Sequence, residues 1–496
     1  MKQNLKSSLN ILLAIIPLLS GCATEKLFGL PIITFDEEAE VEQGANKHQR
    51  IVEQIGTYND AKLSAHISVI GEKLAAASDR PALKWHFTLI DSNIPNAFAT
   101  QGGYVYITRG MLALLQSDDE LAAVLSHEIA HICSRDSLRA QRVGNMMELG
   151  VLGSMVVAPA LILFPQLAAA PAGASMAAFS RKDELNADQH GIVYLQKAGY
   201  SPEAMQAVME VLAIMEAYER DRLKTSGRDA SSQWWHRVYA SHPSTEKREQ
   251  NLVNAAGPSN SSASKNLQPQ FLALLNGLEF GAAKYEGIPY GEKRYFTQWK
   301  LAMKIPDGWR VGINEKYNLM RVMRPEAKAY IQIERSAAID VAHPCDFLAK
   351  LEAPWQISGS NSINHQDLPS CTGMARKTTK TLFNSHEQIF RTAVLAENKS
   401  EGKGYVIRGY ARDKLFEEND LIFLSIIESV EPVLAPNKQP KPLTLHIRRA
   451  TAEDSFASIA RNLPHADKNT ESQLRLLNRR YPDGEITAGD FIKVIE

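Results

Sequence analysis

Two histidines spaced four residues apart, with a glutamate directly after the first, are the feature that most constrains this chain. The stretch reads His127-Glu128-Ile129-Ala130-His131. Residues i and i+4 of an α-helix share a face, so both imidazoles can reach one metal ion, and Glu128 beside them can serve as a general base. Residues 117–120, Ser-Asp-Asp-Glu, form a capping box that predicts where this helix begins. The cap and the apolar helix face disfavour the alternative, a surface helix whose histidines align by accident.

A catalytic zinc ion needs a third protein ligand and an open fourth position. The next acidic helical stretch spans residues 180–188 and contains Glu184 and Asp188, which are spaced i and i+4. One carboxylate can bind the ion while the other holds a ligand histidine through its free ring nitrogen. A solvated acidic helix face is the other interpretation of this spacing. We therefore expect one Zn²⁺ per chain, with a carboxylate from this stretch as its third ligand.

The first 21 residues are typical of an export signal. Lys2 and Lys6 precede an apolar run that is too short to span a bilayer. The run ends Leu19-Ser20-Gly21-Cys22, which resembles the bacterial lipobox, whose cysteine is acylated and becomes the mature amino terminus. An ordinary signal peptide followed by a stray cysteine is the alternative. The lipobox and Ala23 imply a lipid anchor at the periplasmic face of the outer membrane of a Gram-negative bacterium.

Export also changes the interpretation of the remaining cysteines. In an oxidising compartment Cys345 and Cys371 are close enough in sequence to close a disulfide loop. Two unpaired buried thiols are the alternative. Cys133 would then remain as a small core residue.

Charge excludes one class of partner and marks one unusual segment. The chain has 55 Lys+Arg and 56 Asp+Glu, so bulk charge gives no reason to expect a nucleic-acid partner. Residues 149–180 contain no charged side chain and are interrupted by three prolines. We expect this segment to cover the metal site. A spanning helix, and contact with the membrane or with apolar unfolded substrates, are the alternatives.

A polar Gly/Pro/Ser-rich stretch at residues 255–270 and a second linker at 436–442 divide the chain into several domains. The mixture of expected helices and strands predicts an α+β protein. The expected organisation is a signal (1–21), a tether (22–45), a mainly helical metal-binding domain with a small sheet (46–254), a linker (255–270), an α+β domain of unknown role (271–435) and a carboxy-terminal module (436–496). Periodicity predicts helices over 47–76, 202–218 and 345–351, and strands over 85–90, 104–108, 300–305, 320–323, 330–334, 388–396, 404–410 and 421–427. The last residues are expected to form a strand (443–448), two helices (455–463 and 472–480) and a strand (491–495).

Several separate stretches, which together span about 150 residues, match one known sequence pattern in the same order. They are residues 96–99 (Asn-Ala-Phe-Ala), 102–110 (Gly-Gly-Tyr-Val-Tyr-Ile-Thr-Arg-Gly), 120–122 (Glu-Leu-Ala), the 127–131 motif, 181–191 (Arg through Glu184 and Asp188 to Gly) and 241–243 (Ser-His-Pro). Together they resemble the zincin metalloproteases that include the bacterial membrane protease HtpX and the CAAX prenyl endopeptidase. The resemblance is greatest to the periplasmic lipoprotein branch of these gluzincins.

The resemblance implies a role for each matched residue. Glu184 would be the third zinc ligand and Asp188 would orient a ligand histidine. An edge strand for extended substrates would include Asn96, Gly102, Gly103 and Tyr104. His242 would stabilise the oxyanion or occupy the fourth zinc position in a latent state, and a structural turn histidine is the alternative. The chain departs from the family at Asp136, where a histidine is usual after the arginine.

The carboxy-terminal strand-helix-helix-strand order resembles a LysM module. Residues 486–494, Ile-Thr-Ala-Gly-Asp-Phe-Ile-Lys-Val, match its second half, whereas residues 452–455 lack the usual Gly-Asp-Thr turn. This resemblance would add peptidoglycan to the partners.

These observations favour a zinc endopeptidase that degrades misfolded or unassembled envelope proteins, with Glu128 as its base. Its partners would be unfolded protein substrates and, through lipidated Cys22, a membrane surface. Two other hypotheses remain open: a chaperone or assembly factor for outer-membrane proteins with a latent site, and a peptidoglycan-binding scaffold.

Overall fold

The computed structural model describes most of the chain, with gaps. The described residues are 26–27, 30–31, 36–139, 182–225, 248, 251–252, 268–282, 286–314, 318–324, 328–336, 338–353, 355–361, 368–380, 385–398, 402–411, 415–463 and 468–496. Cys22, His242 and the uncharged segment 149–180 lie outside these residues. Within them, no helix combines the length and the apolar character needed to cross a membrane.

The first lobe lies within residues 36–280, and its described residues are mainly helical. Its helices are α2 (Glu37–Ile55), α3 (Ala61–Ala76), α4 (Arg109–Leu114), α5 (Asp118–Cys133), residues 182–197, α9 (Ala204–Thr225) and α12 (Pro269–Leu275). Ahead of it, β1 (Lys26–Leu27) and β2 (Leu30–Pro31) form a short antiparallel pair.

Two sequence expectations for the start of this lobe are wrong. Residues 37–45, expected in a tether, are helical because Asp36 caps α2 by accepting hydrogen bonds from the Glu38 and Ala39 amides. The single helix expected over 47–76 is two helices. Gly56, with a φ of 85°, ends the first, and Asp60 caps the second.

A three-stranded sheet lies beside the helices, in the order β3-β5-β4. Strand β3 (His86–Ile90) is parallel to β5 (Tyr104–Thr108), and β4 (Ala97–Thr100) is antiparallel to β5. The edge strand is therefore β4. The expectation that Tyr104 belongs to the edge strand is wrong, because the turn at Gly102-Gly103 carries the chain into the centre of the sheet.

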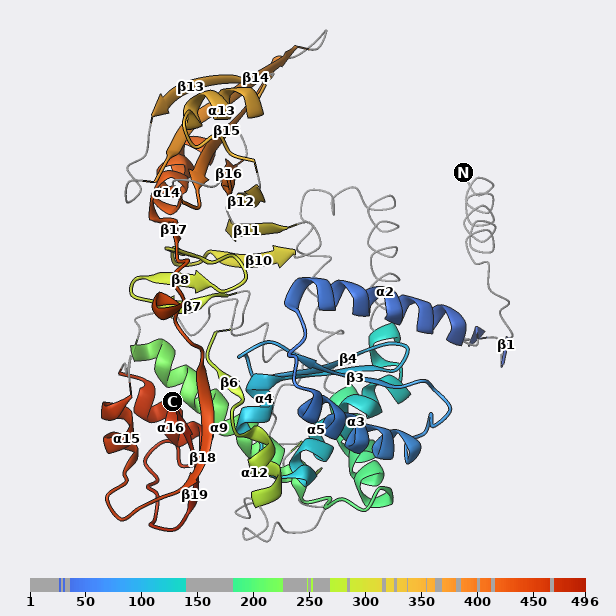
Figure 1. Cartoon of the computed structure of the whole chain (residues 1–496). Coiled ribbons are helices and arrows are strands. Elements are labelled where there is room, and N and C mark those ends of the chain that lie inside the picture. Colours follow the sequence, from blue (N-terminus) through green and yellow to red (C-terminus); the bar gives the residue numbers. More distant parts are fainter. Residues whose placement is uncertain are drawn as a thin grey trace, which may run out of the picture.

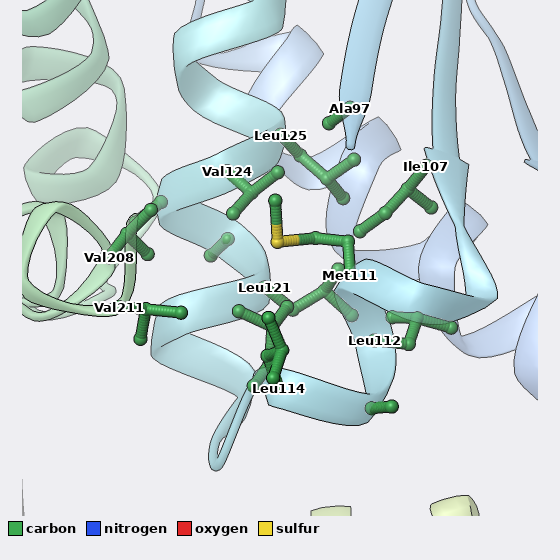
Figure 2. Close-up of a cluster of buried hydrophobic side chains, with 14 of the residues drawn as sticks. Ala97, Ile107, Met111, Leu112, Leu114, Leu121, Val124, Leu125, Val208 and Val211 are labelled. Carbon is green, nitrogen blue, oxygen red and sulfur yellow. The ribbon is translucent and has the colours of Figure 1, made fainter. Parts of the chain in front are cut away.

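Helix α5 is almost completely buried in the core of the first lobe. It packs against the sheet, α3 and α9. Figure 2 shows how α5 side chains meet those of α4, α9 and the strands. The labelled residues in that view are Ala97, Ile107, Met111, Leu112, Leu114, Leu121, Val124, Leu125, Val208 and Val211. A helix enclosed in this way holds its polar side chains in fixed positions.

The inserted domain, residues 281–442, is built on two antiparallel sheets (Figure 1). The four-stranded sheet has the order β17-β9-β8-β7, from Glu431–Pro432, Leu301–Met303, Lys293–Phe296 and Ile288–Tyr290. The seven-stranded sheet has the order β10-β11-β12-β16-β15-β14-β13, from Arg310–Asn314, Leu319–Arg324, Ala329–Ser336, Gly404–Tyr410, Ser385–Ala396, Ser370–Lys380 and Gln356–Asn361. Its helices are α13 (Pro344–Leu351) and α14 (Phe416–Ser429), and a 3-10 turn, η4 (Pro436–Lys438), follows.

The strand expected over 421–427 is wrong, because these residues belong to α14. Phe423, Ile426 and Ile427 are buried at helical spacing, whereas Leu421 is 75% exposed. A short continuous apolar run has no distinguishing period, so it does not separate a buried strand from a buried helix face.

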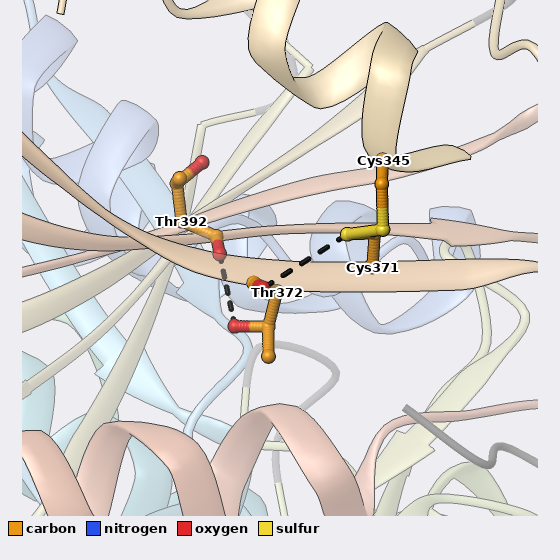
Figure 3. The surroundings of a disulfide bond; sticks show 4 residues. All are labelled: Cys345, Cys371, Thr372 and Thr392. Atoms are coloured by element: carbon orange, nitrogen blue, oxygen red, sulfur yellow. Dashed lines mark hydrogen bonds between the residues drawn. A yellow bond between two sulfur atoms is a disulfide. The ribbon is translucent and has the colours of Figure 1, made fainter. Parts of the chain in front are cut away.

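A disulfide joins α13 to the seven-stranded sheet (Figure 3). Cys345 at the start of α13 is bonded to Cys371 on β14, 26 positions later. The two cysteines lie in a small cluster with Leu348, Val394 and Val406. The bond therefore holds the helix against strands that are distant from it in sequence. Cys133, as expected, is a free cysteine.

The carboxy-terminal module, residues 443–496, has the expected order of elements: β18 (Leu443–Arg449), α15 (Phe456–Asn462), α16 (Thr470–Leu477) and β19 (Phe491–Ile495). Strand β18 pairs with β19 on one side and with β6 (Glu279–Phe280) on the other. Because Phe280 lies opposite Leu443, everything between them is an insertion between two neighbouring strands.

This topology changes the expected linear succession of domains. Helix α12 and β6, assigned from sequence to the α+β domain, share one hydrophobic core with the first lobe and the module. Buried Arg109 holds the junction, because its guanidinium donates to the carbonyls of Glu279 and Gly281 and to Asp91. The inserted domain has a separate core around Phe423.

Candidate metal centre

Helix α5 begins where its sequence predicts. The Ser117 side chain accepts a hydrogen bond from the Glu120 amide at 3.2 Å. The Glu120 carboxylate accepts a hydrogen bond from the Gln116 amide at 2.8 Å. In a standard capping box the donor would be the amide of Ser117, so this hydrogen bond is shifted by one residue. Three turns later the same helix presents His127, Glu128 and His131.

Three side chains converge beside this helix. The Nε2 atoms of His127 and His131 are 3.1 Å apart, and they lie 3.4 and 3.3 Å from the two carboxylate oxygens of Glu184. Ligand atoms around a tetrahedral zinc ion with bonds of about 2.0–2.1 Å are separated by about 3.3 Å. Within the described residues, His127, His131 and Glu184 are the cluster that fits such an ion. Two imidazoles and one carboxylate are also the donor set of a catalytic zinc site.

Each histidine is oriented by a carboxylate on its other ring nitrogen. His131 Nδ1 lies 2.7 Å from Asp136 Oδ2, and His127 Nδ1 lies 3.1 Å from Asp188 Oδ1. A proton on Nδ1 shared with a carboxylate leaves the Nε2 lone pair free to face an ion. The two histidines are thus held with their metal-binding atoms toward Glu184.

Arg248 provides the positive charge beside these carboxylates. Its Nε and Nη2 donate to the two oxygens of Asp188, both at 2.7 Å, and its Nη1 lies 2.9 Å from Glu184 Oε2. Burial raises the pKa of Asp188, but hydrogen bonds to Arg248 and His127 lower it more, so it stays below its usual value. Asp188 is therefore held as the anion that orients His127.

The carboxylates also create a local potential that favours cations. Burial lowers the pKa of His131, but hydrogen bonds to Asp136 and Glu184 raise it more, to about 10. Burial likewise lowers the pKa of His127, and Asp188 and Glu184 raise it above its ordinary value. The potential that favours an imidazolium also favours a bound dication, whose binding would release these protons.

An apolar pocket of about 60 Å³ opens beside the cluster. His127, Glu128 and Arg248 form its polar wall, and Asn96 and Ala97 bring the start of the edge strand to it. Four methionines complete much of the lining: Met111, Met205, Met209 and Met215. Thioether side chains adapt to differently shaped apolar partners, so this pocket can accept a range of side chains.

The main chain of β4 is oriented for pairing with an extended peptide. The Thr108 amide donates to Asn96 O at 3.0 Å, so the main-chain groups of residues 96, 98 and 100 point toward β5. The main-chain groups of Ala97 and Ala99 therefore point away from β5. Among the described residues β4 pairs with β5 and with no other strand.

The structure thus brings together six of the residues singled out from the sequence: His127, Glu128, His131, Glu184, Asp188 and Asn96. Gly102 and Gly103 form the turn between β4 and β5, where a Cβ on Gly103 would lie 2.3 Å from Lys84 O. Tyr104 stacks on His48 and His86 at the sheet surface.

Sequence reasoning missed two residues of the centre. From the sequence, Asp136 is only a departure from the family pattern. However, a carboxylate that lies just beyond the helix end, five residues after a ligand histidine, can reach the Nδ1 atom of that histidine. Arg248 follows the Ser-His-Pro stretch with no spacing that links it to the acidic helix. Its role depends on a contact across 60 positions with Asp188.

Comparisons with known proteins agree with this geometry. Residues 61–256 match the model of peptidase family M48. A "Beta-barrel assembly-enhancing protease" of Yersinia pestis is 32% identical over 170 residues, which are 32% of this chain and 34% of that protein. A protein of the same name from Escherichia coli (strain K12) is 32% identical over 171 residues, with the same coverage. The "Mitochondrial metalloendopeptidase OMA1" of Schizosaccharomyces pombe is 28% identical over 223 residues, which are 44% of this chain and 60% of that protein.

The family match covers most of the first lobe, including the metal centre. The aligned part of the chain spans about a third of the length of the bacterial relatives. The matched segment contains both histidines, Glu128, Glu184, Asp188 and Arg248. Residues 61–256 therefore form a domain of peptidase family M48.

Proposed function

We propose that this chain is a zinc-dependent metalloendopeptidase that hydrolyses peptide bonds of misfolded or unassembled envelope proteins. The observation that carries the proposal is the convergence of His127, His131 and Glu184 beside Glu128, at the wall of an apolar pocket. The name of the bacterial relatives, which refers to β-barrel assembly, supports envelope proteins as the substrate class.

The residues of the site have separate tasks in this mechanism. His127, His131 and Glu184 would hold zinc, which when bound supplies a Lewis acid that polarises the scissile carbonyl. Glu128, buried in α5 and facing the pocket, accepts a proton from the attacking water and delivers it to the leaving amine. Strand β4 pairs with the substrate backbone, while the methionine-lined pocket takes an apolar side chain.

The decisive experiment compares Glu128→Gln with the unaltered chain. Purified protein is assayed for bound zinc and for cleavage of a reduced, unfolded protein. We expect about one zinc per chain in both and a loss of cleavage of at least 100-fold in Glu128→Gln, since the general base is removed. Glu72→Gln, which alters an exposed glutamate on α3, is the matched control and should cleave normally. Stoichiometric zinc without Glu128-dependent cleavage would instead favour a chaperone or assembly role.

We also propose that acylated Cys22 anchors the chain to the periplasmic face of the outer membrane. The support is the lipobox-like sequence before it. Cys22→Ala should move the protein from the membrane fraction to the soluble periplasmic fraction.

Peptidoglycan contact through the carboxy-terminal module is a separate proposal. It rests on the LysM-like sequence and on the strand-helix-helix-strand order of the module. Retention of the full chain on purified peptidoglycan would support it.

A further inference from the structure

A second cavity, of about 710 Å³, lies where the first lobe, the inserted domain and the carboxy-terminal module meet. Leu114 and Met215 line it from the first lobe, Ile305 and Val311 from the inserted domain, and Leu476 from α16 of the module. The cavity therefore needs all three parts of the chain. The two more distant walls lie outside residues 61–256, the segment that matches the peptidase family.

This cavity adjoins the pocket at the metal centre. Pro95 and Met215 line both. Asn93 and Ile94 on its wall precede Asn96 and Ala97 of the pocket at the metal centre, with Pro95 between the two pairs. A peptide that lies along β4 and continues beyond Asn96 would therefore enter the second cavity. An extended chain advances by about 3.3 Å per residue.

The lining of the cavity suits a polypeptide of variable sequence. Leu114, Met215 and Leu476 supply apolar side chains to a lining that is polar and apolar in nearly equal parts. Two of its exposed polar side chains, Arg294 and Arg310, stand on the inserted domain. Arg222 and Glu219, which also line it, pair with each other at 2.8 Å. A small charged ligand would instead require buried polar groups that converge on one point.

We infer that this cavity, the flanking cleft, binds the part of an extended, unfolded substrate that lies beyond the scissile bond. The inference rests on the proposed peptidase function and assigns the inserted domain and the module a role in substrate selection. Long unfolded chains contact all three walls, whereas short peptides reach only the metal centre and its pocket. The flanking cleft thus makes the enzyme prefer long unfolded polypeptides.

The test narrows the cleft with large side chains placed on the inserted domain, outside the segment that matches the peptidase family. Val311→Trp places a large ring in it, and Arg310→Trp does so from an exposed position that carries little risk to folding. The matched control is Leu421→Trp, an exposed site on α14 that does not line the cleft. Each zinc-loaded full chain is given reduced, carboxymethylated α-lactalbumin and a six-residue peptide copied from one of its mapped cleavage sites.

We expect the ratio of kcat/KM for the long substrate to that for the short peptide to fall at least tenfold in both cleft variants and to stay unchanged in Leu421→Trp. A second measurement uses fluorescence anisotropy of labelled carboxymethylated α-lactalbumin bound to Glu128→Gln chains. Adding Val311→Trp or Arg310→Trp to that background should weaken binding at least tenfold.

The two measurements separate this inference from the proposed function. If the unaltered chain cleaves but neither ratio nor binding changes in the cleft variants, the flanking cleft is not a substrate site and the peptidase proposal stands. If no substrate is cleaved while binding still weakens in the cleft variants, the cleft stands as a polypeptide site and the peptidase proposal fails.

Discussion

Asp136 positions a residue of the metal centre without being a metal ligand itself. Its carboxylate lies 2.7 Å from Nδ1 of His131 and also binds Arg139. It lies just beyond the end of α5, where the backbone reverses through Arg135 with a φ of 53°. The position of His131 Nε2 thus depends on a residue outside the motif.

Asp136→Asn should weaken zinc binding about 10- to 100-fold, because an amide holds the histidine tautomer less firmly than a carboxylate. Competition with a chromogenic chelator measures the affinity. Asp118→Asn is the matched control, since Asp118 pairs with His66 at 2.6 Å outside the metal centre. Equal zinc affinity in Asp136→Asn and the unaltered protein would remove Asp136 from the site.

Arg248→Met should destabilise the first lobe by about 3–5 kcal/mol, because it leaves Glu184 and Asp188 buried without their cation. Urea unfolding followed by tryptophan fluorescence measures the change. Arg220→Met, which removes an exposed pair with Glu216 on α9, is the control and should cost less than about 1 kcal/mol. Similar midpoints for both variants would contradict the buried charge network.

At the scale of elements, β19 and α16 support the start of the metal-binding helix. Lys493 on β19 is fully buried, and its Nζ donates to the carbonyls of Ala113 and Leu115, both at 2.6 Å, at the end of α4. Arg479, just after α16, pairs with Glu120 in the first turn of α5. The carboxy-terminal module therefore holds both ends of the α4–α5 connection.

Lys493 makes stability depend on pH in a definite direction. Burial lowers its pKa most, the charge of Arg479 lowers it as well, and Glu120 opposes both, so that its pKa lies at about 7. Between pH 7 and about 10.5 the unfolded chain holds more protons at this site, so the unfolding free energy rises with pH by up to about 1.4 kcal/mol per unit. Below pH 7 lysine is charged in both states and the slope disappears.

Replacing Lys493 with Met should abolish this rise. Urea midpoints of the unaltered protein and Lys493→Met, measured at pH 7, 8.5 and 10, give the comparison. The difference between the two proteins should change steadily over this range in favour of the unaltered chain. Parallel curves would mean that Lys493 keeps its ordinary pKa.

At the scale of the whole molecule, the inserted domain interrupts a chain whose preceding and following parts share one hydrophobic core. Its two ends meet where Phe280 lies opposite Leu443, and its own core is separate from that of the first lobe. Domains whose ends lie close together can be removed or inserted with little effect on the host. Gly281, with a φ of 90°, already has the positive φ that a two-residue hairpin turn requires at its first position.

Replacing residues 282–442 with a single asparagine should therefore leave a folded protein that binds about one zinc per chain. Size-exclusion chromatography, circular dichroism and zinc content measure the outcome. In contrast, truncation after residue 442 removes Leu445, Leu477 and Ile492 from the core of the first lobe and should give insoluble protein. A misfolded excision variant together with a soluble truncated one would contradict the insertion topology.

Local patterns in the sequence carried much of this structure. The capped start of α5 follows from Ser117, and the shared face of His127 and His131 follows from helical spacing. The strand-helix-helix-strand order of the module was also visible in its periodicity. The helical nature of residues 421–427 was not, because their burial on one side depends on the sheet beneath them.

What the sequence determined by itself was the chemistry that local spacing encodes: two imidazoles and a glutamate on one helix, and a carboxylate pair on another. The tertiary structure alone decided which groups surround them. Arg248, Lys493 and the β6–β18 pairing act between segments from 60 to several hundred positions apart. Helical periodicity repeats within a few residues and holds no information about such contacts, whereas burial in a shared core brings them together and requires each buried charge to find a partner.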